Sequence, residues 1–132
     1  MTPPKSGISR EGIPCTVVAT GKDSETSATV VIYTTTTGLY WVMPLSSFEA
    51  EPLAPEAPEP IFMVSLGNFR HFKGTTYSVV VRARDPWTLK NQIVYQSPTG
   101  DLWVRPENMF LEEVEWADGV RRHRFIYIIE GL

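Results

Sequence analysis

Aromatic and basic side chains gather in the second half of the chain, in two segments that have the composition of β-strands. Trp103 and Arg105 are two positions apart, as are Arg82 and Arg84, and alternate residues of a strand share a face. An exposed indole ring beside guanidinium groups can stack on a planar group and pair with an anion. With His71 near the mouth, these residues predict a non-catalytic binding module for a small, planar, anionic, nucleotide-like ligand.

A structural role is the alternative interpretation of the same residues. In that case Trp103 packs beneath a loop or between two halves of the chain, and Arg105 pairs with Glu107 or Glu112. Large aromatic residues in small barrels are usually packing residues, which favours this interpretation for Trp103.

Catalysis finds little support in the residue types. The single cysteine, Cys15, lies in an apolar segment, which favours a packing residue over a nucleophile. Neither His71 nor His123 has an Asp or Cys beside it in the sequence, and Glu112 and Glu113 point to opposite faces of a strand. We expect no enzyme activity, no cofactor and no metal site, with a hydrolase that uses His71 as the remaining alternative.

The charge is unevenly distributed along the chain. The 132 residues have a formal net charge of −3, and 20% of them are charged. Residues 1–60 contain three basic and seven acidic side chains, whereas residues 61–132 contain nine and eight. An anionic partner is therefore expected in the second half. The negative net charge argues against a protein that coats nucleic acid.

Neither end of the chain nor its interior shows a membrane signal. No run of about 18 apolar residues is present, so we expect no membrane span. The opening segment, MTPPKSGISREG, lacks the apolar stretch of a signal peptide, so we expect a cytoplasmic protein.

The sequence resembles itself at an offset of 62 residues. Gly12–Glu51 aligns with Gly74–Glu113 without a gap, and 13 of the 40 positions are identical. The identical pairs are Gly12/Gly74, Val17/Val79, Val18/Val80, Asp23/Asp85, Thr26/Thr88, Tyr33/Tyr95, Thr37/Thr99, Gly38/Gly100, Trp41/Trp103, Val42/Val104, Pro44/Pro106, Phe48/Phe110 and Glu51/Glu113. This similarity predicts a tandem duplication.

The offset also predicts where the halves divide. Residues 61–66 align with 123–128, and both segments are apolar and of strand length. The proline-rich residues 52–60 are then a loop inside the first half, and an interdomain linker is the alternative. We expect a diverged first repeat over residues 1–67 and a second repeat over 68–132.

The composition of the second half predicts short strands and one helical turn. Strands are expected over 75–85, 92–97 and 102–106, a helical turn over 107–110, and a closing hairpin from 111–116 and 123–129. Strict alternation over the first of these strands places Tyr77, Val79, Val81 and Ala83 on one face.

These elements predict an all-β protein. The expected fold is a tandem pair of five-stranded, SH3-like antiparallel barrels with short 3₁₀ turns, packed pseudo-symmetrically. A sheet shared by both halves is the alternative. A homo-oligomer is compatible with either arrangement.

Two segments of the second half carry a family resemblance. FRHFKGTTYSVVV (69–81) and LWVRPENMFLEEVE (102–115) resemble a family of bacterial domains of unknown function, number 1653, whose members are mostly single domains of about this repeat length. The first half departs from the pattern, with Ser9-Arg10-Glu11-Gly12 in place of the opening segment and Met43 in place of Arg105. The resemblance implies that a site, if present, belongs to the second half, and it implies no activity.

A protein-interaction module is the second functional hypothesis. Small barrels often bind extended peptides in aromatic grooves, and the acidic, proline-rich residues 52–60 would serve as a docking segment. The expected partner is then another protein, and the chain itself is expected to be a bacterial or phage protein.

Overall fold

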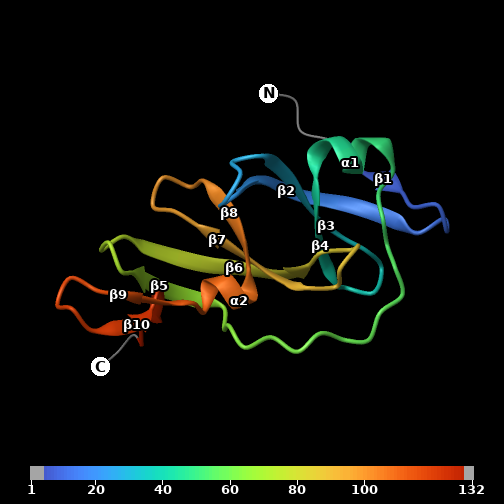
Figure 1. Cartoon of the computed structure of the whole chain (residues 1–132). Coiled ribbons are helices and arrows are strands. Elements are labelled where there is room, and N and C mark those ends of the chain that lie inside the picture. Colours follow the sequence, from blue (N-terminus) through green and yellow to red (C-terminus); the bar gives the residue numbers. More distant parts are fainter. Residues whose placement is uncertain (1–4, 130–132) are drawn as a thin grey trace.

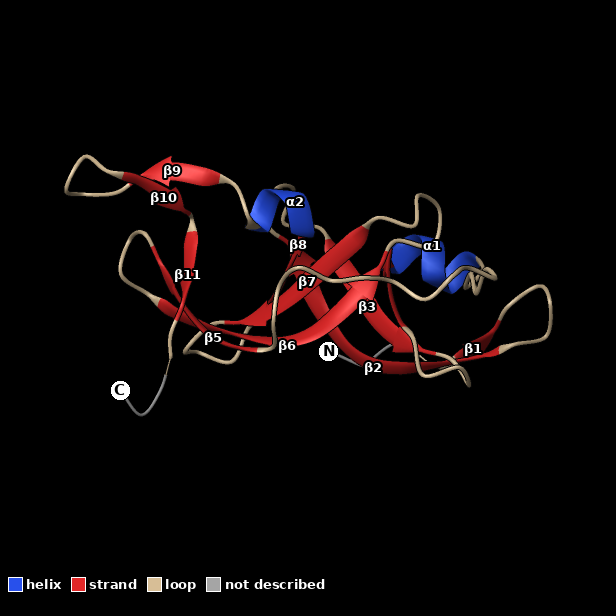
Figure 2. Cartoon of the chain, turned by 90° about the horizontal axis from the view of Figure 1, so that it is seen from below, coloured by secondary structure: helices blue, strands red, loops and turns tan. Residues whose placement is uncertain are grey.

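Three strands from each half of the chain close one six-stranded β-barrel (Figures 1 and 2). The computed structural model describes residues 5–129. Around the barrel the strands follow the order β6-β4-β3-β2-β8-β7, and β7 pairs with β6 to close it. The barrel strands are β2 (Pro14–Asp23), β3 (Thr29–Thr34), β4 (Tyr40–Pro44), β6 (Thr76–Arg84), β7 (Asn91–Gln96) and β8 (Leu102–Pro106). The expected all-β class is confirmed.

The barrel is shared between the halves. In each half three consecutive strands form an antiparallel meander, β2-β3-β4 and β6-β7-β8. Two parallel pairings join the meanders, β4 with β6 and β2 with β8. The described residues therefore form one barrel in place of the two five-stranded barrels expected from the sequence. A meander alone leaves two open strand edges, and each half covers the edges of the other.

Shorter elements extend the barrel at both ends. β1 (Gly7–Ile8) pairs with β2, β5 (Gly67–His71) pairs with β6, and β11 (Phe125–Tyr127) pairs with β5. β9 (Glu113–Glu115) and β10 (Arg121–His123) form a separate hairpin at one end of the molecule (Figure 2). The expected closing hairpin is thus wrong in its second strand, because residues 125–127 pair with β5 and not with β9.

Two helical turns follow equivalent strands. α1 (Leu45–Ala50) follows β4, and α2 (Glu107–Phe110) follows β8. Each begins after a proline, Pro44 or Pro106, with nearly the same backbone angles. The helical turn predicted over 107–110 is confirmed. Within residues 5–129, neither helical segment has the length and apolar character needed to cross a membrane.

Three apolar clusters form the core. The barrel interior is filled by small aliphatic side chains from all six strands. Outside the barrel, one cluster lies under α1 in the first half, and another lies among α2, β5 and β11 in the second half. Cys15 belongs to the outer cluster of the first half and is 1% exposed. The buried residues of the interior cluster are Val30, Ile32, Val42, Ala83, Val94 and Val104, and the partly buried Ala19 of β2, Val81 and Leu102 pack against them.

The halves share local structure at the 62-residue offset. The Oδ1 atoms of Asp23 and Asp85 each accept the N–H groups two and three residues ahead, at 2.8 and 3.0 Å in both halves. In the same two loops Ser27 and Leu89 adopt positive φ angles of 62° and 63°. Aspartate at this position supplies acceptors to a turn whose backbone N–H groups lack strand partners.

A β-bulge changes the alternation predicted for the first strand of the second half. The register of β6 against β7 shifts between Val79 and Val81. Tyr77 and Val79 consequently pack into the outer cluster, whereas Val81 and Ala83 pack into the barrel interior. The single shared face expected for these four residues is wrong, because a bulge inserts one unpaired residue and reverses the alternation. β2 has the equivalent shift between residues 17 and 19.

The segment between α1 and β5, residues 51–66, runs along the outside of the barrel without forming a helix or strand (Figure 1). We call it the strap. Its first part is held by side chains of the barrel: the Tyr33 hydroxyl donates to the carbonyl of Leu53 at 2.7 Å, and Arg84 Nη1 donates to that of Pro58 at 2.8 Å. The proline-rich part of the strap is therefore anchored.

The second part of the strap is held by Asn91 and Glu107. Asn91 Nδ2 donates to the carbonyl of Ile61 at 2.7 Å. Glu107 Oε2 accepts the N–H groups of Met63 and Val64 at 2.8 and 2.9 Å. Residues 61–66, an apolar run of strand length, form no strand, because side chains rather than a neighbouring strand take up the backbone hydrogen bonds.

Candidate functional site

His71 and Arg105 meet at the ring of Phe125, outside the barrel. The ring centroids of His71 and Phe125 are 4.9 Å apart, and the guanidinium carbon of Arg105 lies 5.8 Å from the Phe125 centroid. The sheet sets this position, because β11 pairs with β5 and places Phe125 opposite His71. Two of the five residues predicted to bind a ligand thus share one site.

Two further cations lie beside them at Phe72. The Lys73 ammonium is 5.7 Å and the Arg124 guanidinium carbon 5.5 Å from the centroid of the Phe72 ring, which is itself 4.6 Å from the His71 ring. We call His71, Lys73, Arg105 and Arg124, with these phenylalanines, the cationic site. Arg124 was not predicted as a site residue, and its only signal in the sequence is the basic run at 121–124.

Arg105 forms no ion pair with an acid among residues 5–129. Its Nε donates to the Tyr95 hydroxyl at 3.4 Å. Glu107 bonds the strap instead, and Glu112 lies 3.6 Å from Arg124. The predicted pairing of Arg105 with one of these glutamates is therefore wrong.

Arg124 has unused hydrogen-bonding capacity. Its Nη2 faces Glu112 at a distance too long for a hydrogen bond. Its Nε is buried and has no acceptor within the described part of the chain. A buried donor without an acceptor is unfavourable, so a bound acceptor at this point would be stabilising.

His71 is held in its neutral form. Burial, followed in order of importance by the charges of Arg124, Arg105 and Lys73, lowers its pKa to about 4. Lys73, two residues away in the sequence, is one of these three cations. His71 Nδ1 accepts the N–H of Lys73 at 3.2 Å. The proton of the neutral ring is therefore assigned to Nε2, which is a hydrogen-bond donor.

The other three predicted residues lie elsewhere. Arg84 is 7% exposed and bonds the carbonyls of Leu89 and Pro58, so it anchors the strap and does not face solvent. Arg82 stacks on a strap residue at a groove described below. Trp103 is half-buried against the outer cluster, beside Lys22 of β2. The five residues do not form the single Trp-Arg face expected, because the strap covers part of it.

The first half lacks the cationic site. Met43 is equivalent to Arg105, is 1% exposed and packs in the first-half cluster. Ser9, which is 5% exposed, is equivalent to His71. The same fold thus carries charge at this place in only one half.

Other candidate groups for chemistry are unpromising. Burial raises the pKa of the Cys15 thiol, which disfavours the reactive thiolate. In the described part of the chain, no three His, Cys, Asp or Glu side chains gather where they could hold a metal ion.

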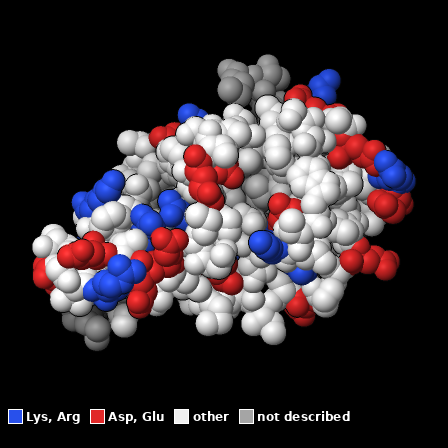
Figure 3. All heavy atoms as spheres, viewed as in Figure 1, with Lys and Arg blue, Asp and Glu red and all other residues white. Residues whose placement is uncertain are grey.

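The surface carries both signs of charge. Basic and acidic side chains are interspersed on the face shown in Figure 3, and both gather over the end that carries β9 and β10. The face shown in Figure 3 therefore carries no large, purely basic surface.

Comparison with known proteins finds a family match within the second half of the chain. Residues 67–127, from β5 to β11, match a family model described as "Protein of unknown function (DUF1653)". The match includes both segments that carry the resemblance. No curated protein and no solved structure matches the chain.

Proposed function

We propose that residues 67–127, which match the DUF1653 family model, act as a non-catalytic binding module for a planar, anionic, nucleotide-like ligand at the cationic site. The observation that carries the proposal is the meeting of His71 and Arg105 at Phe125. These residues come from the two segments that mark the family, and they meet only in the folded domain.

The charge balance supports an anionic ligand. Arg105, Arg124 and Lys73 all act on His71, and Glu112 is the one acid that forms an ion pair with any of them among residues 5–129. Guanidinium groups bind phosphate and carboxylate with two parallel hydrogen bonds. The buried Nε of Arg124 and the Nε2–H of His71 add two donors. A phosphate group would satisfy donors that the protein leaves free.

The aromatic rings support a planar ligand. Phe125 is 4% exposed and stacks on Phe110, so its ring is not open to a ligand. The half-buried Phe72, with the Arg124 guanidinium against its ring, supplies the flat apolar surface beside the cations. A nucleotide combines a planar base with an anionic phosphate and matches both features.

The test asks separately whether binding requires the planar base and whether it requires the anionic phosphate. Isothermal titration with AMP, adenosine and inorganic phosphate at low salt should show binding of AMP and binding about ten-fold weaker for each fragment. Arg105→Met introduces the residue type that the first half has at the equivalent position, Met43. This variant should weaken AMP binding about ten-fold. Lys90→Ala removes one exposed charge of the same half and serves as the control.

Two results would contradict this proposal. One is the absence of binding by any nucleoside phosphate or short oligonucleotide to folded protein. The other is equal binding by the wild type and Arg105→Met.

A protein-interaction module remains a second candidate because two apolar side chains protrude from the strap. Ile61 is 86% and Met63 76% exposed, while the alternate residues Phe62 and Val64 pack inward. Loss of a captured partner on replacing both with serine, with no change in folding, would support it. Unchanged capture would oppose it.

We also infer that the two halves arose by duplication, with repeats over 1–67 and 68–132. The 13 identities at one offset and the matching aspartate turns support this origin. In this proposal the first half, which lacks the cationic site, completes the barrel for the second.

A further inference from the structure

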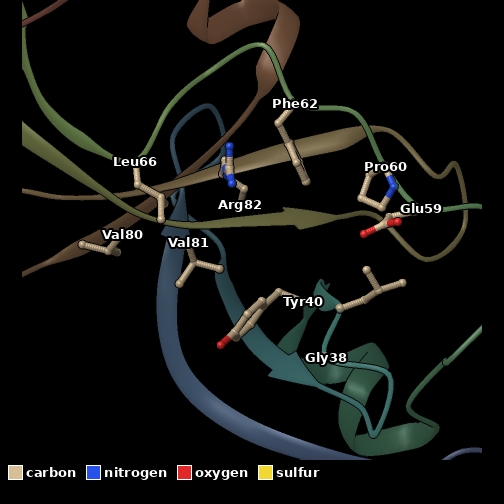
Figure 4. A pocket seen from close by; sticks show the side chains of 10 residues that line it. Gly38, Tyr40, Glu59, Pro60, Phe62, Leu66, Val80, Val81 and Arg82 are labelled. Carbon is tan, nitrogen blue, oxygen red and sulfur yellow. The ribbon is translucent and has the colours of Figure 1, made fainter.

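The parallel pairing of β4 with β6 opens a groove between the two halves. The two strands pair at a single position, Trp41 with Arg84. Before that position they separate, and Gly38–Tyr40 faces Val80–Arg82 across a groove of about 350 Å³ (Figure 4). The strap closes the third side with residues 59–66. The groove is built from both halves and is separate from the cationic site.

The walls of this groove are mainly apolar. Tyr40, Leu66 and Val80 line it and remain 38%, 49% and 40% exposed. Val81 and Phe62 complete the walls. Apolar side chains that line a concave surface and remain accessible to water can gain free energy by covering an apolar ligand.

One cation lies within this apolar setting. Arg82 stacks on the Phe62 ring, with its guanidinium carbon 5.2 Å from the ring centroid, and donates from Nη1 to the carbonyl of Val64 at 3.3 Å. Among residues 5–129 it forms no ion pair with an acid. Glu59 lies on the side of the groove opposite Val80 and Leu66 (Figure 4). Arg82 therefore has donors left for an anionic group.

The second junction between the two halves of the chain provides a comparison. β2 and β8 also pair in parallel, and a groove of about 350 Å³ lies there too. In that groove Thr20 takes the place of Arg82, Leu102 that of Tyr40 and Asp101 that of Leu39. The second groove also has one cation, Lys22, and one acid, Asp101, so the first groove is distinguished by a guanidinium group that stacks on an aromatic ring.

We propose that the groove at Arg82 binds a small amphipathic monocarboxylate. The carboxylate pairs with the Arg82 guanidinium, and the hydrocarbon body lies over Val80, Val81 and Tyr40. Glu59, on the far side of Arg82, disfavours ligands with a second negative charge. The apolar walls and the single charge complement a carboxylate with an apolar tail better than they complement a nucleotide.

Titration of the full-length protein with octanoate and octanamide, followed by amide NMR shifts, tests this proposal. Octanoate should shift the amides of residues 38–40 and 80–82 and bind about ten-fold more tightly than the uncharged amide. Arg82→Met should remove the preference for the carboxylate. Val80→Glu, at an exposed position, should weaken octanoate binding even if Arg82→Met perturbs the strap.

Lys22→Met is the matched control, because it removes one positive charge from the equivalent groove. It should leave octanoate binding unchanged. Equal binding of both probes to the wild type would overturn the proposal. So would shifts confined to other residues, or the absence of saturable shifts at millimolar octanoate with folded protein. AMP binding at the cationic site is measured separately, so failure of either proposal leaves the other testable.

Discussion

Arg105 shows how one position can serve packing in one half and charge in the other. Met43, its equivalent, is fully packed in the first-half cluster. The long stem of an arginine can occupy the same space while its charged end reaches the edge of the cluster. Both residues point away from the barrel interior, so the exchange leaves the barrel unaffected. This explains how the cationic site can be confined to one half of the fold.

The neutral state of His71 makes stability depend on pH. Its folded pKa of about 4 lies below its ordinary value of 6.5, so between these values the unfolded chain binds more protons. Stability should therefore fall as the pH drops from 6.5 towards 4, and the contribution is complete above 6.5. We expect His71→Phe, which keeps an aromatic ring at this place, to lose less stability than the wild type between pH 7 and pH 5.

Urea unfolding of both proteins at the two pH values measures this difference. The carboxylates titrate in both proteins, so the comparison isolates the histidine. Identical losses of stability in wild type and variant would show that His71 is not held neutral in the folded state.

At the scale of elements, proline and turn signals were readable from the sequence. β8 and α2 have the predicted bounds, because Pro106 ends the strand and begins the helix. The bulge at Val80 was not readable, because three consecutive valines fit either alternation. The second part of the strap, residues 61–66, is apolar and of strand length but forms no strand. Its partners are side chains far away in the sequence, and sequence patterns do not show them.

The same limit applies to the candidate site. His71 and Arg105 could be named because local motifs contain them. Arg84 was misplaced because alternation correctly put it outside the barrel but said nothing about the strap above it. Arg124 was missed because only the pairing of β11 with β5 brings it near Phe72.

Glu107 is the residue on which the second part of the strap depends. It is 7% exposed and bonds the N–H groups of Met63 and Val64. Glu107→Ala leaves these buried donors unpaired, which should lower the free energy of unfolding by about 1–3 kcal/mol. Glu107→Gln keeps one acceptor oxygen and should have a smaller effect.

Limited proteolysis with thermolysin, combined with mass analysis, locates the change. Cleavage within residues 61–66 should accelerate in Glu107→Ala, with Glu49→Ala on exposed α1 as the control. Equal cleavage rates in both variants would mean that other contacts hold the strap.

At the scale of the whole molecule, the family match covers fewer residues than those that form the barrel. The match covers residues 67–127, which supply only β6, β7 and β8 of the six barrel strands. The interior cluster also draws on both halves, with Val30, Ile32 and Val42 from the first and Ala83, Val94 and Val104 from the second. The matched segment alone therefore lacks half of its barrel core.

This arrangement predicts how residues 51–132 behave when expressed alone. The fragment keeps the strap and the outer cluster, but β6 and β8 each have an open edge where β4 and β2 pair in the full chain. A second copy can fill both edges through a twofold axis, because the missing strands have the same local structure as those present. We expect a folded dimer, shown by light scattering and circular dichroism, and loss of folding and dimerisation together in Val104→Asp. A folded monomer would show that three strands suffice and that the shared barrel is not required.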